Sequence, residues 1–189
     1  METGGMIFDE YKCIFIHLEK TGGTSIESLF ANNGCRLVIE DRHLRARQVA
    51  ERRPDKWRDY FTFTIVRNPW EKIYSWWWND HEHGKVKMSF KEHVKFLSGL
   101  KGNHISTNQV DFIRARPPID HIGRFENLRE EMNMLIDRFD LNDTTIPHER
   151  KIPNKPHCSA YYDDELVELV GKMFEKDIKR FGYEFPSAL

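Results

Sequence analysis

A short apolar run followed directly by a glycine-containing turn and a helical pattern, residues 13–34, constrains the fold more than any other stretch. The run Cys13 to Ile16 is continuously apolar, which is typical of a strand buried on both faces of a parallel sheet. A helical pattern of apolar residues begins at about Thr24 and ends before Gly34, a helix stop signal. A strand, a tight turn and a helix in this order predict an α/β protein with a mainly parallel sheet.

Strand and helix patterns alternate along the rest of the chain. Residues 60–66 predict a second strand, after which Asn68 and Pro69 supply the N-cap and the first position of a helix. Further helices are predicted behind a capping box at 89–92, over 128–139 and over 166–181, with a short strand at 121–123. Because 189 residues suffice for one core, we expect a single domain over 1–189, in which residues 1–10 form a flexible leader.

Composition excludes several classes of protein. The formal net charge is -1, so charge does not indicate nucleic acid as a partner. Three cysteines at unsuitable spacings predict reduced thiols, with neither a disulfide framework nor a metal site. No apolar stretch has the length of a membrane span, and the leader lacks the features of a signal peptide. We therefore expect a soluble, cytoplasmic protein without a membrane partner.

The exit of the first predicted strand carries the residue types that hold an anion. Glycines let the backbone approach a ligand, N–H groups at a helix start favour phosphate, and a lysine adds charge. The alternative is that Thr24 and Glu27 form only a capping box after a flexible turn. The Walker A pattern does not fit, because its lysine follows the last glycine. The residues of this exit are Lys20, Thr21, Gly22, Gly23, Thr24 and Ser25.

The exit of the second predicted strand offers another cation. Arg67 directly follows the strand, and Ser75 lies two turns into the next helix, so a guanidinium fork and a hydroxyl are available to a second anion. The alternative is an ion pair of Arg67 with Glu71 or Asp9, with Ser75 facing solvent. Two separate anion sites indicate a ligand that is phosphorylated at two places.

These motifs resemble those of sulfotransferases that use 3′-phosphoadenosine 5′-phosphosulfate (PAPS). "FIHLEKTGGTS" is similar to their 5′-phosphosulfate loop, and "TIVRNPWEKIYSWWW" to their 3′-phosphate strand and helix. "NQVDFI", "IDHIGRFENLREEM" and "YYDDELVELVGKMFEKDIKRFGYEF" are similar to later segments of the carbohydrate-type branch. The resemblance covers nearly the whole chain and implies a P-loop-like, three-layer fold in which helices flank a central sheet.

The resemblance also implies a chemistry. A sulfuryl group passes from PAPS to an acceptor hydroxyl or amine, a carbohydrate among the candidates, by in-line displacement and without a metal. Lys20 and residues 21–25 contact the phosphosulfate, while Arg67 and Ser75 contact the 3′-phosphate. Lys20 and the loop amides stabilise negative charge on the departing phosphate oxygen.

An acceptor hydroxyl needs a general base, for which histidine has the most suitable pKa. His43 lies between the two nucleotide motifs and is favoured over His17, which directly precedes the Lys20 segment. The alternatives are an exposed histidine in a charged segment for His43, and a loop-orienting hydrogen bond for His17. Glu19 replaces a proline of many relatives; we expect it to point outward or to pair with a cation, and pointing inward would make it a rival base.

The partners expected are a nucleotide donor and a small-molecule or carbohydrate acceptor, and neither the acceptor nor the oligomeric state follows from the sequence. At least one tryptophan of the run 76–78 should be buried, since consecutive helical positions point in different directions.

Two other functional classes remain open. The first is a P-loop nucleotide kinase; the position of the lysine and the lack of an acidic residue after the second predicted strand argue against it. The second is a non-catalytic protein that binds the nucleotide but does not turn it over.

Overall fold

The computed structural model describes residues 6–35, 43–100, 105–146 and 155–187. The chain divides into two compact units, one of residues 1–66 and 112–151 and one of residues 67–111 and 152–189. We call them the sheet unit and the helical unit. The single domain over 1–189 stays a prediction. In the described part of the chain, no helix combines the length and the apolarity that crossing a membrane requires.

The sheet unit contains a four-stranded sheet in the order β1-β2-β3-β4. Its strands are β1 (Met6–Phe8), β2 (Cys13–Ile16), β3 (Phe61–Val66) and β4 (His121–Arg124). β2, β3 and β4 are parallel, and β1 pairs with β2 antiparallel. The α/β class with a mainly parallel sheet is therefore confirmed.

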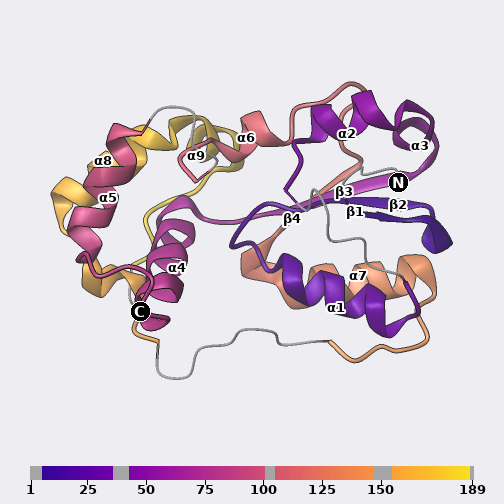
Figure 1. Cartoon of the computed structure of the whole chain (residues 1–189), viewed down its shortest axis with the longest axis horizontal. Coiled ribbons are helices and arrows are strands. Elements are labelled where there is room, and N and C mark those ends of the chain that lie inside the picture. Colours follow the sequence, from indigo (N-terminus) through magenta and orange to yellow (C-terminus); the bar gives the residue numbers. More distant parts are fainter. Residues whose placement is uncertain (1–5, 36–42, 101–104, 147–154, 188–189) are drawn as a thin grey trace. The chain divides into compact units, whose positions relative to one another are not determined.

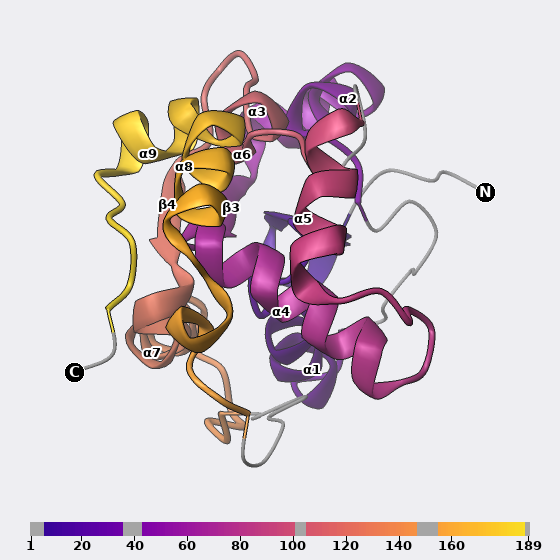
Figure 2. The ribbon, with the colours of Figure 1, turned by 90° about the vertical axis from the view of Figure 1, so that its left-hand side faces the viewer.

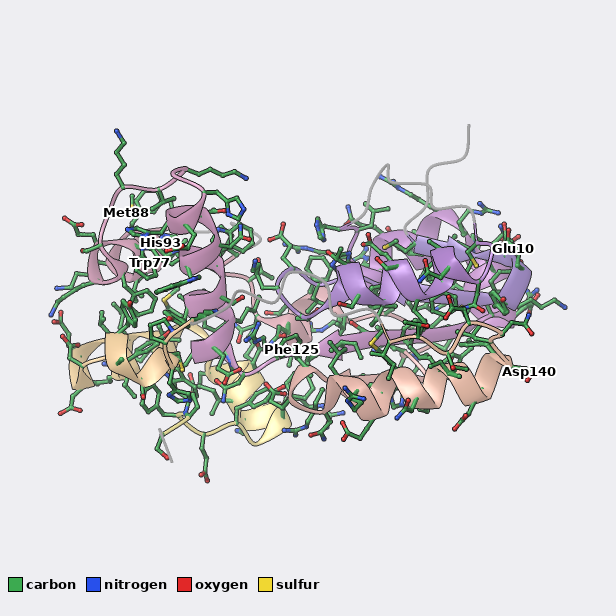
Figure 3. The ribbon with its side chains drawn as sticks, turned by 90° about the horizontal axis from the view of Figure 1, so that it is seen from below. Glu10, Trp77, Met88, His93, Phe125 and Asp140 are labelled. Atoms are coloured by element: carbon green, nitrogen blue, oxygen red, sulfur yellow. The ribbon has the colours of Figure 1, made fainter. Side chains whose placement is uncertain are left out.

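Helices cover both faces of this sheet, as Figure 1 shows. α1 (Gly23–Asn32) and α7 (Leu128–Phe139) lie on one face, and α2 (Ala46–Arg52) and α3 (Pro54–Asp59) on the other. In Figure 3, Phe125 and Asp140 mark the two ends of the α7 segment. The predicted three layers are present within this unit.

The core lies between the sheet and the pair α1 and α7. Phe15 of β2 and Phe63 of β3 are register partners whose rings stack with their centroids 5.0 Å apart. Phe30 of α1 and Met132 of α7 belong to the same buried cluster. Because each such side chain contributes about 1.5–3 kcal/mol when it leaves water, this cluster fixes α1 against the strand that precedes it.

The helical unit is built from α4 (Pro69–Glu82), α5 (Phe90–Gly99), α8 (Asp164–Met173) and α9 (Glu175–Phe181). α4, α5 and α8 pack against one another (Figure 2). An aromatic cluster fills the space between them and includes Tyr74, Trp77, Phe90 and Tyr161. Figure 3 shows Trp77 close to Met88, whose carbonyl accepts the indole N–H at 3.0 Å. Trp77 is thus the buried member expected of the tryptophan run.

Local sequence signals placed most helix starts correctly. Asn68 caps α4 by accepting a hydrogen bond from the N–H of Trp70, and Ser89 and Glu92 form the predicted capping box of α5. The strand predicted at 121–123 is β4.

Two predictions need correction. The last helix is two helices, because Phe174 leaves helical geometry with φ −114° and ψ 29° and α9 begins after it; Gly182 ends α9 with φ 66°, as predicted. Part of the leader is structured, since Met6–Phe8 forms β1 and Asp9–Tyr11 a 3₁₀ turn. Short elements that the sequence analysis did not place are α2, α3 and α6 (Gln109–Phe112), together with 3₁₀ turns at Phe125–Asn127 and Cys158–Tyr161.

Candidate functional site

The loop between β2 and α1, residues 18–25, has a conformation fixed by its own contacts. We call it the Lys20 loop. The Thr21 hydroxyl is fully buried and donates to the carbonyl of Leu18 at 2.8 Å. Lys20 has φ 65° and Gly22 has φ 82°, so the chain turns sharply through the left-handed region at both positions. Gly22 suits this conformation because it has no Cβ, whereas for Lys20 the same conformation is unfavourable.

Close packing adds to this constraint. A Cβ on Gly22 would lie 2.7 Å from Leu128 Cδ2, and one on Gly23 would lie 2.0 Å from His17 Nε2. Gly22 therefore rests on the start of α7, and Gly23 rests on an imidazole ring. Gly22 is required here by its contacts and by its positive φ, whereas Gly23 is required by its contacts alone.

The capping-box alternative for this loop is wrong. The N-cap of α1 is Gly22, which has no side chain to accept a hydrogen bond, and Thr24 is the second residue of the helix. Glu27 does not reach back to the N-cap; its Oε1 lies 2.7 Å from Nδ1 of His17, and both residues are buried. The first turn of α1 thus begins at a glycine with no side-chain cap, which is the arrangement that suits an anion at a helix start.

The two candidate bases lie side by side at this loop. The rings of His17 and His43 have centroids 4.6 Å apart, and His43 Nδ1 lies 3.1 Å from the backbone carbonyl oxygen of His17. Because a carbonyl oxygen only accepts, His43 Nδ1 must carry the proton of this bond. The lone pair of a neutral His43 is therefore on Nε2. Glu19 Oε1 lies 3.8 Å from that atom, so Glu19 is near a potential cation, as expected.

Burial separates the two histidines. The side chain of His43 is 36 % exposed, whereas that of His17 is 6 % exposed and lies between Glu27 and Gly23. His43 is thus open to a ligand from outside, and His17 is part of the packing under the Lys20 loop.

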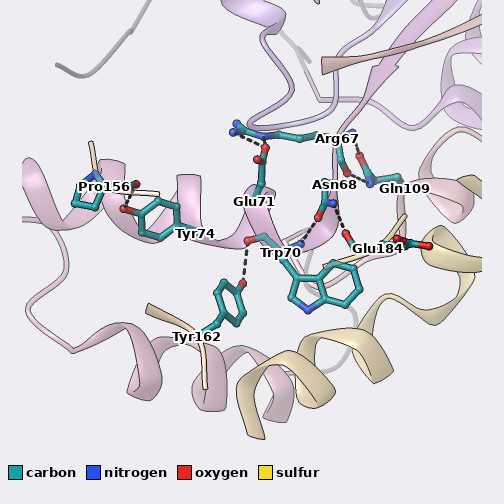
Figure 4. A network of polar contacts seen from close by, with 9 residues as sticks. All are labelled: Arg67, Asn68, Trp70, Glu71, Tyr74, Gln109, Pro156, Tyr162 and Glu184. Atoms are coloured by element: carbon teal, nitrogen blue, oxygen red, sulfur yellow. Dashed lines mark hydrogen bonds and ion pairs between the residues drawn. The ribbon is translucent and has the colours of Figure 1, made fainter. Parts of the chain in front are cut away.

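Arg67 is held in the helical unit by a network of polar contacts (Figure 4). The buried Gln109 side chain brackets its backbone, accepting from the Arg67 N–H at 2.9 Å and donating to the Arg67 carbonyl at 2.8 Å. Asp177 in turn accepts from the Gln109 backbone N–H at 2.8 Å. Burial raises the pKa of Asp177, which these N–H donors partly oppose. The backbone of Arg67 is therefore fixed before any ligand binds.

The Arg67 side chain contacts Glu71, so the ion pair given as the alternative to an anion site is present. Nη2 and Nε lie 3.3 Å and 3.4 Å from Glu71 Oε2. These distances are long for a charge-assisted hydrogen bond, which is normally about 2.7–2.9 Å. Glu71 and Ser75 are four residues apart and so share one face of α4, and Arg67 lies just before the helix, four residues ahead of Glu71. Ser75 is half-buried.

Three potential metal ligands also gather at Glu71. Ligand atoms of Glu71, His157 and Cys158 lie within 4.8 Å of one another. Burial raises the pKa of the Cys158 thiol to about 11, so the thiol is protonated at neutral pH, and the Arg67 guanidinium already faces the carboxylate. These conditions favour an anion over a metal cation at this place.

The structure thus brings the predicted residues together in two groups. His17, His43 and the Lys20 loop form one group in the sheet unit, and Arg67 and Ser75 form another in the helical unit. Sequence reasoning missed the buried carboxylate partner of His17 and the Gln109–Asp177 support of Arg67. The sequence resemblance at "NQVDFI" was the one signal that pointed to Gln109.

The segment between β2 and β3 contains many arginines and lysines, and several of those that the structure describes pair with acids. Arg47 Nε lies 2.7 Å from Glu51 Oε1, and Lys56 Nζ lies 2.6 Å from Asp9 Oδ1. Residues 36–42, which include Arg36 and Arg42, lie outside the described residues. The basic residues named here are therefore part of a salt-bridged surface.

Comparison with known proteins gives three findings. The model of the sulfotransferase family matches residues 4–184. A solved structure of a sulfotransferase from Alicyclobacillus acidocaldarius is similar to this chain at 13 % sequence identity and a TM-score of 0.47, with 95 % of this chain and 94 % of that chain covered. A search of curated proteins finds no match.

Proposed function

The chain belongs to the sulfotransferase family, and we propose that it transfers a sulfuryl group from PAPS to an acceptor hydroxyl, with carbohydrates as the first class to test, or else to an acceptor amine. PAPS supplies the activated sulfuryl group and a phosphate leaving group. The observation that carries the proposal is the Lys20 loop, in which a lysine and a glycine N-cap without a side-chain acceptor precede α1. This arrangement fits the phosphate end of such a donor.

In this proposal each part of the Lys20 loop has a task. The backbone N–H groups at the start of α1 and the Lys20 ammonium bind the phosphosulfate and stabilise the charge that develops on the leaving oxygen. Thr21 keeps the loop in shape through its bond to Leu18. Thr24 supplies its N–H group and its hydroxyl at the first turn, and Ser25 supplies its hydroxyl, because the Ser25 N–H donates to the Gly22 carbonyl. Arg67 and Ser75 bind the 3′-phosphate, and Gln109 holds the backbone of Arg67 in place for that purpose.

We propose His43 as the general base and Nε2 as the atom that takes the acceptor's proton. Its Nδ1–H is engaged by the His17 carbonyl, so Nε2 carries the lone pair, and the ring is open to an acceptor. His17 is too buried to meet an acceptor directly. Glu19 stabilises the imidazolium that forms on His43, because its carboxylate is close to Nε2.

Two measurements test the proposed donor. Saturating 3′,5′-phosphoadenosine should raise the melting temperature, by about 5–11 °C at 100 times Kd for a chain of this length, while ATP with Mg²⁺ should not. Labelled sulfate should then pass from PAPS to members of a panel of sugars, phenols and amines. Selective stabilisation by ATP with Mg²⁺ would favour a P-loop kinase instead. Stabilisation by 3′,5′-phosphoadenosine with no transfer to any acceptor would favour a non-catalytic binding protein.

Three variants test the proposed base. His43→Ala should lower kcat by about 10²–10⁴-fold, the usual contribution of general base catalysis. Glu19→Gln should lower kcat by less than about tenfold, since it removes only the charge beside the base. His83→Ala, an exposed histidine at the C-cap of α4 in the helical unit, is the control and should have no effect. A larger loss for Glu19→Gln than for His43→Ala would make Glu19 the base.

A further inference from the structure

The His17–Glu27 contact is a buried ionisable pair directly beneath the proposed base. The side chains of His17 and Glu27 are 6 % and 4 % exposed, and their Nδ1 and Oε1 atoms lie 2.7 Å apart. Removing two such groups from water is costly unless each has the other or a hydrogen bond as a partner. Because neither group of this pair reaches the solvent, its orientation affects the side chains that pack against it.

The His17 imidazole is restrained on every side for which the structure gives a contact. Its ring lies against Gly23, where a Cβ would come within 2.0–2.6 Å of three ring atoms. The Phe15 ring stacks on it with a centroid distance of 5.4 Å. Glu27, one turn after Gly23 on α1, places its Oε1 2.7 Å from Nδ1, a close contact of ionisable groups without the geometry of a hydrogen bond. These contacts together restrict the orientation of the ring, and Glu27 is the polar side chain among them.

His43 depends on His17 in two ways. Its Nδ1–H donates to the His17 carbonyl, and its ring rests against the His17 ring at 4.6 Å with an interplanar angle of 60°. Loss of the fixed His17 ring would remove the surface on which His43 rests. The Lys20 loop is less dependent on this ring, since Thr21 and Gly22 hold it through Leu18 and Leu128.

We propose that Glu27 is a positioning residue of the sulfuryl-transfer reaction: it fixes the His17 imidazole, and His17 in turn fixes His43 with Nε2 directed outward. Glu27 touches neither donor nor acceptor in this arrangement. It acts through two contacts in series, from its carboxylate to His17 and from His17 to His43. The inference rests on the proposed function, because it concerns the base of that reaction.

The kinetic test uses two substitutions of Glu27 and one matched control. Glu27→Ala should lower kcat about tenfold, whereas Glu27→Gln, which keeps an acceptor oxygen of the same reach, should lower it about threefold. The Kd of 3′,5′-phosphoadenosine should change less than twofold in both, because the base does not bind the nucleotide. Glu131→Ala is the control, since Glu131 makes a His–Glu contact of the same 2.7 Å with His121 in the same unit. It should lower the melting temperature but leave kcat within twofold.

The spectroscopic test does not need turnover. Histidine ¹⁵N spectra of the whole chain should show His43 as the Nδ1–H tautomer, and Glu27→Ala should give a mixture of tautomers, with Glu27→Gln between the two. If wild-type protein transfers no sulfuryl group, the proposed function fails and these spectra still decide the role of Glu27. An unchanged His43 tautomer in both Glu27 variants would overturn the inference, and so would an equal loss of kcat in Glu131→Ala. Should Glu27→Ala fail to fold, Glu27→Gln decides by the same readouts.

Discussion

Substitution of Gly23 by alanine is the sharpest test of the packing under the Lys20 loop. The new Cβ would lie 2.0 Å from His17 Nε2, 2.2 Å from Cδ2 and 2.6 Å from Cε1. The ring would have to move by about 1.4 Å to reach an ordinary contact of 3.4 Å, and this movement breaks its 2.7 Å contact with Glu27. Overpacking costs about 1–3 kcal/mol, and a stranded buried polar group costs about as much again.

We therefore expect Gly23→Ala to lower the free energy of unfolding of the sheet unit by about 3 kcal/mol, which is a fall in melting temperature of about 6–12 °C. Hydrogen exchange at the amides of β2 and α1 is the suitable assay, because it reads the sheet unit alone. Gly34→Ala is the matched control in the same unit. Gly34 has φ 86° and no atom within 4 Å of a new Cβ, so its cost of about 1 kcal/mol comes from the backbone only.

The double variant Gly23→Ala with His17→Ala decides whether the ring is the cause. Removing the imidazole should abolish the clash, so Gly23→Ala should add less than about 0.5 kcal/mol in that background. If alanine at position 23 costs as much without the imidazole as with it, the reasoning from this contact is refuted.

Three further predictions concern binding, pH and helix capping. Lys20→Ala should lower kcat by about 10²–10³-fold with a small change in the Kd of 3′,5′-phosphoadenosine. Arg67→Ala should instead raise that Kd by about 10–100-fold, measured by calorimetry, and Arg58→Ala is its control. Burial raises the pKa of Cys35 to about 12, whereas an unfolded thiol ionises near its ordinary value of 9. The unfolded state therefore loses this proton first, and the free energy of unfolding should fall above pH 9 by up to about 1.4 kcal/mol per pH unit. Cys35→Ala should reduce this slope in denaturant titrations. Ser89→Ala should cost about 1 kcal/mol in hydrogen exchange of α5, and Ser98→Ala, on the exposed face of the same helix, should cost less.

Sequence patterns predicted the elements whose signals are local. The apolar run before the Lys20 loop, the Asn68-Pro69 start of α4 and the Ser89 capping box each lie within a few residues, and each predicted element formed. The break between α8 and α9 could not be predicted in this way. Phe174 continues the apolar spacing of Leu166 and Val170, and no glycine or proline marks the place where the helix stops.

The candidate site was predictable in its residue types and not in its contacts. Glu27 stands three residues after Thr24, which is the spacing of a capping box, yet the N-cap is Gly22 and the carboxylate lies against His17. Gln109 and Asp177 are separated by 68 positions, and no periodicity links them. Contacts of this kind depend on the folded backbone, so a sequence pattern alone does not reveal them.

The division of the chain has a consequence for its synthesis on the ribosome. The sheet unit is interrupted, because residues 67–111 of the helical unit are made between β3 and β4. At about 5–20 residues per second, the β3 edge that later pairs with β4, where Phe63 is the register partner of His121, waits about 3–10 s for its neighbour. An open strand edge is a template for pairing with other chains. We therefore expect nascent protein to be most exposed to aggregation in this interval, and slower translation of residues 67–120 should lower the yield of folded protein.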